Sequence, residues 1–292
     1  MRRVTTQTDA TQTDARFWST RVSGGGAISD LRRAAGVPRG LVREWRMALP
    51  RMSDRRSMIR YGTDQALYRA LAFAPASDRL RTIRVGDATV TYRLQRGDIQ
   101  AVREVWVEEC YRPPVEIPLD TVVDLGMNIG LTSLWYGLHG ASKLICVEPV
   151  PENLRLGRRN LGQNGVTAKF VRAAIGPEDG TTRFRRDPMY STHGHVDERG
   201  ELEVPVLSMA TLLADIERVD LLKIDIEGGE IPLLRGDLSW LRKVGAIIIE
   251  FGVGDAPELA PIVEAHGFRF IPTGSVWWNS MDFFVREELA SA

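Results

Sequence analysis

From residue 121 onward the sequence repeats one local pattern, in which a short apolar run leads through a turn into an amphipathic stretch. The apolar runs cover 121–125, 144–147, 169–173, 221–224, 246–251, 268–271 and 282–285, and the amphipathic stretches cover 131–138, 151–163, 227–235 and 257–266. Apolar strands that alternate with helices predict an α/β fold with a mainly parallel sheet and helices on both faces. Ligands of such folds bind beyond the carboxyl ends of the strands, so functional residues are expected directly after each run.

The chain before this pattern divides into two segments of different character. Residues 6–15 repeat TQTDA twice and offer no large apolar side chain, so we expect 1–27 to be a disordered tail. Residues 28–112 have apolar residues at helical spacing, followed by an alternating pattern across Gly86-Asp87 that predicts a hairpin. A helix over 103–111 is predicted to end before the prolines that follow.

The α/β pattern assigns residues 113–292 to one sheet domain. Its ligand edge is open, and we expect 28–112 to form a helical and hairpin cap over that edge, enclosing a small-molecule substrate. The same segment is the expected place for contacts in a homodimer. The polar, basic stretch 181–199 interrupts the alternation and is expected to be an insertion near the open edge.

Charge and composition exclude several classes of protein. The chain has 38 Lys and Arg and 38 Asp and Glu, whereas a domain that binds nucleic acid is usually strongly basic. No apolar run approaches the roughly 18 residues that span a bilayer, and the basic start is followed by polar residues rather than the apolar core of a secretory signal. We therefore expect a cytoplasmic protein with no nucleic-acid or membrane partner. Cys110 and Cys146 are too few for a disulfide framework or a four-cysteine zinc site.

The first glycine turn follows the run 121–125. Asp124, Gly126, Met127, Asn128 and Gly130 lie in an Asp-x-Gly-x-x-x-Gly pattern. A dinucleotide site requires a second glycine where Asn128 stands, and an acid before the turn would repel a pyrophosphate. The same acid suits a ligand with an amino group, so the pattern favours S-adenosylmethionine (SAM) over NAD. The alternative is an ordinary glycine turn without a ligand.

Glu148 ends the second strand, 24 residues after Asp124, and is followed by Pro149. A carboxylate at this strand tip can accept hydrogen bonds from both ribose hydroxyls of an adenosine. The alternative is that Glu148 only favours the dipole of the helix that begins at Pro151. Asp124 and Glu148 together make the cofactor interpretation the stronger one.

A third group of acids follows the run 221–224. Asp225 stands at the strand tip, and Glu227 and Glu230 are predicted to share one face of the next helix. Asp225 is the first candidate for a proton acceptor and for a cofactor contact, and Glu227 is the second candidate acceptor. Glu250 ends the next strand and is expected at the same edge, in contact with the substrate. For Glu230, helix-terminus electrostatics is an equally good explanation.

Two further features are weaker. His193 and His195 flank Gly194 like two metal ligands, but no third ligand is evident, so we expect no metal and assign His193 to the substrate site as a third candidate base. Trp277, beside a second tryptophan, is expected to wall the substrate pocket, although a small secondary core is an equal alternative.

Five segments carry a family resemblance: 124–130, 148–149, 171–176, 204–212 and, above all, 223–230. In these segments the chain resembles the FkbM family of SAM-dependent methyltransferases, over about residues 121–250, with weaker similarity at Arg96 and Asp98. Met127 and Gly229 depart from the family pattern, and Met127 is expected to narrow the site. The resemblance implies a class I methyltransferase fold of seven strands, the last antiparallel, and adds Ala173 to the expected cofactor-binding residues.

The resemblance also implies methyl transfer, mostly to hydroxyl groups of small molecules or sugars and often in bacterial secondary metabolism. We therefore expect a SAM-dependent methyltransferase that acts on a heteroatom, foremost a hydroxyl oxygen. One alternative is a different acceptor atom, such as an amide, carbamoyl or amine nitrogen, or an RNA base. More distant alternatives are an NAD-dependent oxidoreductase and a non-catalytic SAM-binding protein.

Overall fold

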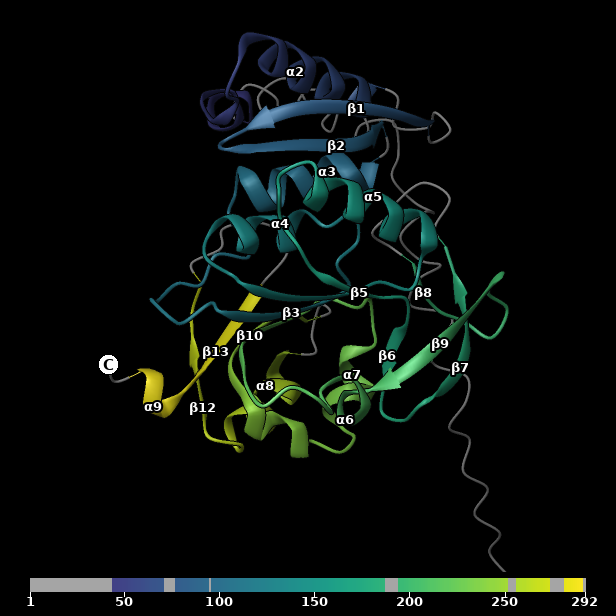
Figure 1. Cartoon of the computed structure of the whole chain (residues 1–292), viewed down its shortest axis with the longest axis vertical. Coiled ribbons are helices and arrows are strands. Elements are labelled where there is room, and N and C mark those ends of the chain that lie inside the picture. The colour runs from purple at the N-terminus through teal and green to yellow at the C-terminus, as the bar shows by residue number, and fades with distance from the viewer. Residues whose placement is uncertain are drawn as a thin grey trace, which may run out of the picture. The chain divides into compact units, whose positions relative to one another are not determined.

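The computed structural model describes residues 44–70, 77–94, 96–186, 194–251, 256–273 and 281–290. Apart from Glu44, these residues belong to one compact unit, Trp45–Ala292. The expected disordered tail, His193 and Trp277 lie outside the described residues. Figure 1 shows the arrangement of the helices and strands.

A seven-stranded sheet runs through the centre of this unit, in the order β12-β13-β11-β10-β3-β4-β5. Its strands are β3 (Thr121–Leu125), β4 (Lys143–Val147), β5 (Lys169–Val171), β10 (Val219–Ile224), β11 (Val244–Glu250), β12 (Phe268–Ile271) and β13 (Met281–Arg286). Neighbouring strands are parallel except that β13 lies antiparallel between β11 and β12. The α/β prediction with a mainly parallel sheet is confirmed.

Both faces of the sheet are covered, and successive residues of its central strands are buried. Val122 belongs to one buried cluster and its neighbour Val123 to the other, as the alternation of side chains along a strand requires. The first cluster is covered by α4 (Leu131–Leu138) and α5 (Pro151–Gly162), and the second by α6 (Met209–Leu212), α7 (Glu230–Leu234) and α8 (Ala256–Glu264). These two helical layers lie on opposite sides of the sheet in Figure 1.

The N-terminal part of the unit contains η2 (Leu49–Arg51), α2 (Arg55–Ala70), the strands β1 (Ser77–Val85) and β2 (Ala88–Leu94), and α3 (Arg96–Trp106). The predicted hairpin is confirmed, since β1 and β2 pair across Gly86, whose φ is 51°. The predicted helix over 103–111 is confirmed only as far as Trp106, where α3 ends. The amide of Glu108 departs from the helical pattern, since it donates to the carbonyl of Arg103, five residues back.

Side-chain amides of α5, rather than strand pairing, attach this hairpin to the central domain. Asn160, Gln163 and Asn164 bond the backbone of Thr89 and Thr91 on β2. The Nδ2 atom of Asn160 also donates to the carbonyl of Ile129, 2.8 Å away. One buried amide therefore joins the hairpin to the glycine turn that follows β3.

The segment predicted as a polar insertion at 181–199 is part of a second sheet. This sheet has the order β6-β9-β7-β8 and consists of β6 (Ala174–Gly176), β7 (Gly180–Arg185), β8 (His195–Val196) and β9 (Leu202–Ser208). Phe184 and Val204 on its buried face form a small core with Val150. The insertion therefore contributes an apolar wall beside the end of β4, which its polar composition did not indicate.

Candidate active site

The glycine turn after β3 is held in an unusual backbone conformation. Gly126, Asn128 and Gly130 have φ of 75°, 49° and 78°, the left-handed region that glycine adopts without strain. A Cβ on Gly126 would lie 1.8 Å from the carbonyl oxygen of Asp225, so no other residue fits at this crossing of β3 and β10. The turn is further fixed by the amides of Gly126 and Met127, which both donate to the carbonyl of Val147.

The Met127 side chain is buried and packs against α5. A Cβ on Gly157 would meet its Cε at 1.9 Å, so the methionine occupies space that Gly157 leaves open. The substitution that departs from the family pattern is thus accommodated in the core between the turn and α5.

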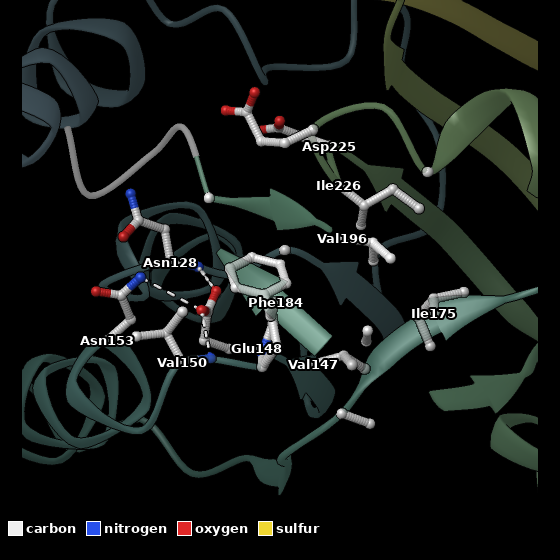
Figure 2. A pocket seen from close by; sticks show the side chains of 17 residues that line it. Asn128, Val147, Glu148, Val150, Asn153, Ile175, Phe184, Val196, Asp225 and Ile226 are labelled. Carbon is white, nitrogen blue, oxygen red and sulfur yellow. Dashed lines mark hydrogen bonds between the residues drawn. The ribbon is translucent and has the colours of Figure 1, made fainter. Parts of the chain in front are cut away.

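Glu148 reaches the glycine turn from the end of β4. Its Oε2 accepts from the amide of Asn128 at 2.9 Å, and its Oε1 accepts from the amide of Val150 at 2.9 Å and from Asn153 Nδ2 at 3.3 Å. Burial raises the pKa of Glu148 to about 7, although these hydrogen bonds oppose the shift. Figure 2 shows this carboxylate beside Asn128 and Asn153 at one side of a cavity.

Asp124 and Asp225 share one buried lysine. Lys223 Nζ lies 3.2 Å from Asp124 Oδ1 and 3.3 Å from Asp225 Oδ2, and it donates to the carbonyl of Gly126 at 2.7 Å. Burial alone would lower the pKa of Lys223, but the two carboxylates raise it above its usual value. Lys223 was not predicted as a site residue, although a lysine in an otherwise apolar strand was the available signal.

Asp124 points into the protein rather than into a cavity. It is fully buried, and its Oδ2 accepts from Ser133 Oγ at 2.6 Å. The Oγ atom of Ser133 in turn accepts from the thiol of Cys146, a buried free cysteine, at 3.2 Å. Asp124 does not line either of the two cavities described next. Its contacts instead hold Lys223 and, through Ser133, helix α4.

The first cavity lies over Glu148. Its polar lining includes Asn128, Glu148 and Asp225. Figure 2 shows Asn128 and Glu148 together and Asp225 apart from them. Its apolar lining includes Val147, Pro149, Val150, Ala173, Ile175 and Phe184. Two expected cofactor residues, Pro149 and Ala173, are therefore brought to Glu148.

The second cavity adjoins the first and has about 660 Å³ of empty space. The two share Gly126, Asn128, Asp225 and Glu227 in their linings. The other charged or hydroxyl-bearing residues that line the second cavity are Glu104, Tyr111, Thr132, Lys223 and Glu250. Glu104 and Tyr111 come from the segment 28–112 and were not predicted as site residues.

The predicted arrangement of Glu227 and Glu230 on one helix face is wrong. Glu227 has a φ of 54° and precedes α7, which begins only at Glu230. Glu230 folds back to accept from the amides of Ile226 at 2.7 Å and Gly228 at 2.8 Å. Glu230 therefore stabilises the loop. Of these two acids, Glu227 is the one that lines the cavities.

Three glutamates of the second cavity are harder to ionise than free carboxyl groups. Burial raises the pKa of Glu104 to about 7. Burial, and then the charge of Asp225, raises the pKa of Glu250 well above its usual range. The pKa of Glu227 is raised by burial of its carboxyl group and then by the charge of Asp225, although the residue as a whole is exposed. Glu227 and Glu250 are therefore more readily protonated than free glutamates.

These shifts predict that the ligand-free protein loses stability as pH rises. The pKa of Glu104 and Glu148 is about 7 in the folded protein against 4.5 for a free carboxyl, so their contribution is complete below about 4.5 and is lost through about 7. Urea denaturation at pH 6 and pH 9 should give a lower free energy of unfolding at pH 9. Glu250→Gln should reduce this difference, whereas Glu264→Gln at the exposed end of α8 should not. Equal stability at both pH values would contradict the assignment.

The fold and the paired cavities define the class of the protein. An α/β domain with an acid-flanked glycine turn, a carboxylate at the second strand tip and an adjoining second cavity is a SAM-dependent methyltransferase of the class I type. The chain belongs to the FkbM family: the methyltransferase FkbM domain matches residues 124–270, half of the chain. The oxidoreductase and non-catalytic alternatives are therefore set aside.

Similar proteins include the 31-O-demethyl-FK506 methyltransferase FkbM of Streptomyces tacrolimicus, 26% identical over 238 residues that cover 67% of this chain and 91% of that protein. The hexuronic acid methyltransferase AglP of Haloferax volcanii is 22% identical over 183 residues, 59% of this chain and 76% of that protein. Among solved structures, the 16S rRNA N2 G1207 methyltransferase RsmC of T. thermophilus has a TM-score of 0.39 and 13% identity, and the match covers 73% of this chain and 51% of that chain.

None of the helices among the described residues has the length and apolarity to cross a membrane. Within the same ranges, no group of three or more His, Cys, Asp or Glu side chains is arranged to hold a metal ion.

Proposed function

We propose that this methyltransferase holds SAM in the first cavity and transfers its methyl group to a hydroxyl oxygen of a small molecule in the second cavity. The observation that carries the proposal is the junction of the two cavities at Gly126, Asn128, Asp225 and Glu227. A ligand that fills the first cavity reaches the second one only at this junction. The junction is accordingly where the methyl group and the acceptor atom meet.

The residues of the first cavity fit SAM in three respects. Glu148 keeps lone pairs beyond its three protein hydrogen bonds, and we assign these to the ribose hydroxyls. Val150, Ile175 and Phe184 offer an apolar surface for the adenine ring. Asn128 Oδ1 is buried without a hydrogen-bond partner, and the SAM ammonium group would supply the missing donor.

Methyl transfer from SAM requires the protein mainly to position the two substrates. SAM supplies a methyl group already activated by its positive sulfonium. The chain must exclude water, align the acceptor oxygen and take the proton that a neutral alcohol loses as it attacks. The raised pKa values of Glu227 and Glu250 mark them as hydrogen-bond donors to acceptor oxygens in the neutral range. Asp225, paired with Lys223, is then the carboxylate we assign as proton acceptor.

The remaining assignments rest on the sequence alone. His193 as an alternative base and Trp277 as a pocket wall lie outside the described residues. A role in bacterial secondary metabolism, a cytoplasmic location and a homodimer are part of the same proposal. The FkbM relatives support the first of these, because one of them is a 31-O-demethyl-FK506 methyltransferase.

The proposal is tested in two stages. Thermal shift and calorimetry should show binding of SAM and S-adenosylhomocysteine but not of NAD. Transfer of isotope-labelled methyl from SAM should then be measured against a panel that contains a macrolide alcohol, hexuronic acid glycosides, and small amides and amines. Labelling confined to nitrogen acceptors would replace the hydroxyl assignment by the N-methyl alternative, and absence of SAM binding would reject the proposal.

Glu148→Ala should weaken SAM binding by at least about tenfold, since hydrogen bonds to a charged acceptor contribute about 1.5–3 kcal/mol each before water compensates. Calorimetry at pH 8 would measure the change. Glu152→Ala, on the first turn of α5 with a half-exposed side chain, is the matched control and should bind normally. Unchanged SAM affinity in the Glu148 variant would remove the ribose assignment.

A further inference from the structure

Tyr111 is a buried residue at the junction of the N-terminal segment and the active site. Its hydroxyl donates a hydrogen bond to Asp225 Oδ2 over 3.0 Å, across 114 residues of sequence. Its side chain lines the second cavity, and only 7% of the residue is exposed. It is therefore the residue through which the N-terminal segment touches the carboxylate assigned as proton acceptor.

The position of Tyr111 is fixed from two sides. Tyr136 on α4, fully buried, donates through its hydroxyl to the carbonyl oxygen of Tyr111 at 2.8 Å. The Tyr111 ring lies under the lysine of the buried ion pair, with Lys223 Nζ 5.5 Å from the ring centroid, within the range of a cation–π contact. A side chain held at its main chain and along its ring offers its hydroxyl in one direction only.

We propose that Tyr111 is a positioning residue, which orients Asp225 for methyl transfer by holding its Oδ2 atom and leaving Oδ1 for the ligand. This inference rests on the proposed role of Asp225. Tyr111 and Lys223 both contact the Oδ2 atom of Asp225. The Oδ1 atom has no hydrogen-bond or ion-pair partner among the described residues. The carboxylate is thus tethered on one oxygen and presents the other.

The hydroxyl of Tyr111 is suited to this part because it stays protonated. Burial, and then the charges of Asp225, Glu104 and Glu250, raise the pKa of Tyr111 well above its usual value. A donor that never ionises in the working range stabilises the charged form of its acceptor. Loss of that donor leaves the carboxylate of Asp225 without the hydrogen bond that orients it.

Several charged groups surround Asp225. Lys223 and Tyr111 are in contact with its carboxylate, and Asp124 is the second anion on Lys223. The carboxyl groups of Glu104, Glu227, Glu230 and Glu250 interact with it through space. A test of Tyr111 must therefore compare variants in which only one of these groups changes.

The test uses SAM and S-adenosylhomocysteine as probes, so it needs no knowledge of the acceptor. The two ligands differ only in the methyl group and its sulfonium charge, so the ratio of their affinities, measured by calorimetry at one pH, reports how the site interacts with that charge. In the wild-type chain the ratio should favour SAM, because the free oxygen of Asp225 faces the ligand. In Tyr111→Phe the preference for SAM should fall about threefold to tenfold, because the carboxylate is no longer held in one orientation.

Tyr92→Phe is the matched control. It deletes a buried hydroxyl that donates to Asp64 Oδ2 at 2.7 Å, an equivalent tyrosine–aspartate pair in the N-terminal segment. This variant should lose comparable stability and keep the wild-type ratio of affinities for SAM and S-adenosylhomocysteine. The double variant Tyr111→Phe with Asp225→Asn should match Asp225→Asn alone.

The outcomes separate two failures. If Asp225→Asn leaves the affinity ratio unchanged, the proposed role of Asp225 fails and the Tyr111 proposal is overturned with it. If Asp225→Asn lowers the preference for SAM but Tyr111→Phe keeps the wild-type ratio, or shows a change that Tyr92→Phe reproduces, only the Tyr111 proposal is overturned.

Discussion

Asp225→Asn is expected to lower the rate of methyl transfer by about 10²–10⁴-fold, the usual effect of removing a general base. The substitution keeps the shape of the side chain while deleting the oxygen that takes the acceptor proton. The rate should be measured in single turnovers with the acceptor identified from the panel, on a variant whose fold is confirmed by circular dichroism. SAM binding should weaken far less than the rate falls.

Asp220→Asn provides the control for this prediction. Asp220 lies on the same strand, β10, and is also buried, with its Oδ2 accepting from the amide of Thr121 at 2.9 Å. It lies near the start of β10, at the other end of the strand from Asp225, so the variant should transfer methyl groups at nearly the normal rate. A near wild-type rate in Asp225→Asn would mean that the base lies elsewhere, with His193 the next residue to change, or that the acceptor is an amine that needs alignment alone.

Lys223→Met is expected to destabilise the protein by about 3–5 kcal/mol, because it leaves the buried carboxylates of Asp124 and Asp225 without their cation. Lys223 is 2% exposed, so water cannot replace the lost charge. Urea denaturation at pH 7 measures the change. The double variant Lys223→Met with Asp124→Asn should recover part of the loss, since it removes one of the two uncompensated charges.

Lys243→Met is the matched control for the lysine. Lys243 donates one hydrogen bond to the carbonyl of Leu213 at 2.6 Å and is only partly buried, so its replacement should cost much less. Equal losses in the two variants, or no recovery in the double variant, would show that the ion pairs contribute little to stability.

The sheet was predictable because its strands are buried on both faces. A strand of this kind is apolar over successive positions, as at 144–147 and 246–249, and it is recognisable without knowledge of its neighbours. The second sheet was not predictable for the opposite reason. The residues of β7 are mostly polar and exposed, and only Phe184 among them is buried, so the segment has the composition of a loop.

The same distinction applies to the site. The glycine turn and Glu148 were found because the constraints on them are local, namely a left-handed backbone and the end of a strand. Tyr111 and Lys223 were missed because their partners lie about a hundred residues away in the sequence. The placement of Glu227 was also hidden, since its left-handed backbone interrupts a pattern that otherwise reads as the start of a helix.

The amides that fasten the hairpin to α5 set where this chain can be recombined with its relatives. A chimera cut at the start of the sheet domain would join this chain's α5 to a foreign hairpin. Asn160 would then lose its hydrogen bond to the hairpin carbonyl of Thr91, while it kept the bond to Ile129 in the glycine turn. Engineering of acceptor specificity by segment exchange therefore has to move the hairpin and α5 together. The hairpin and α5 must therefore be exchanged as one unit. They are not contiguous in the sequence, because 56 residues separate the end of β2 at Leu94 from the start of α5 at Pro151.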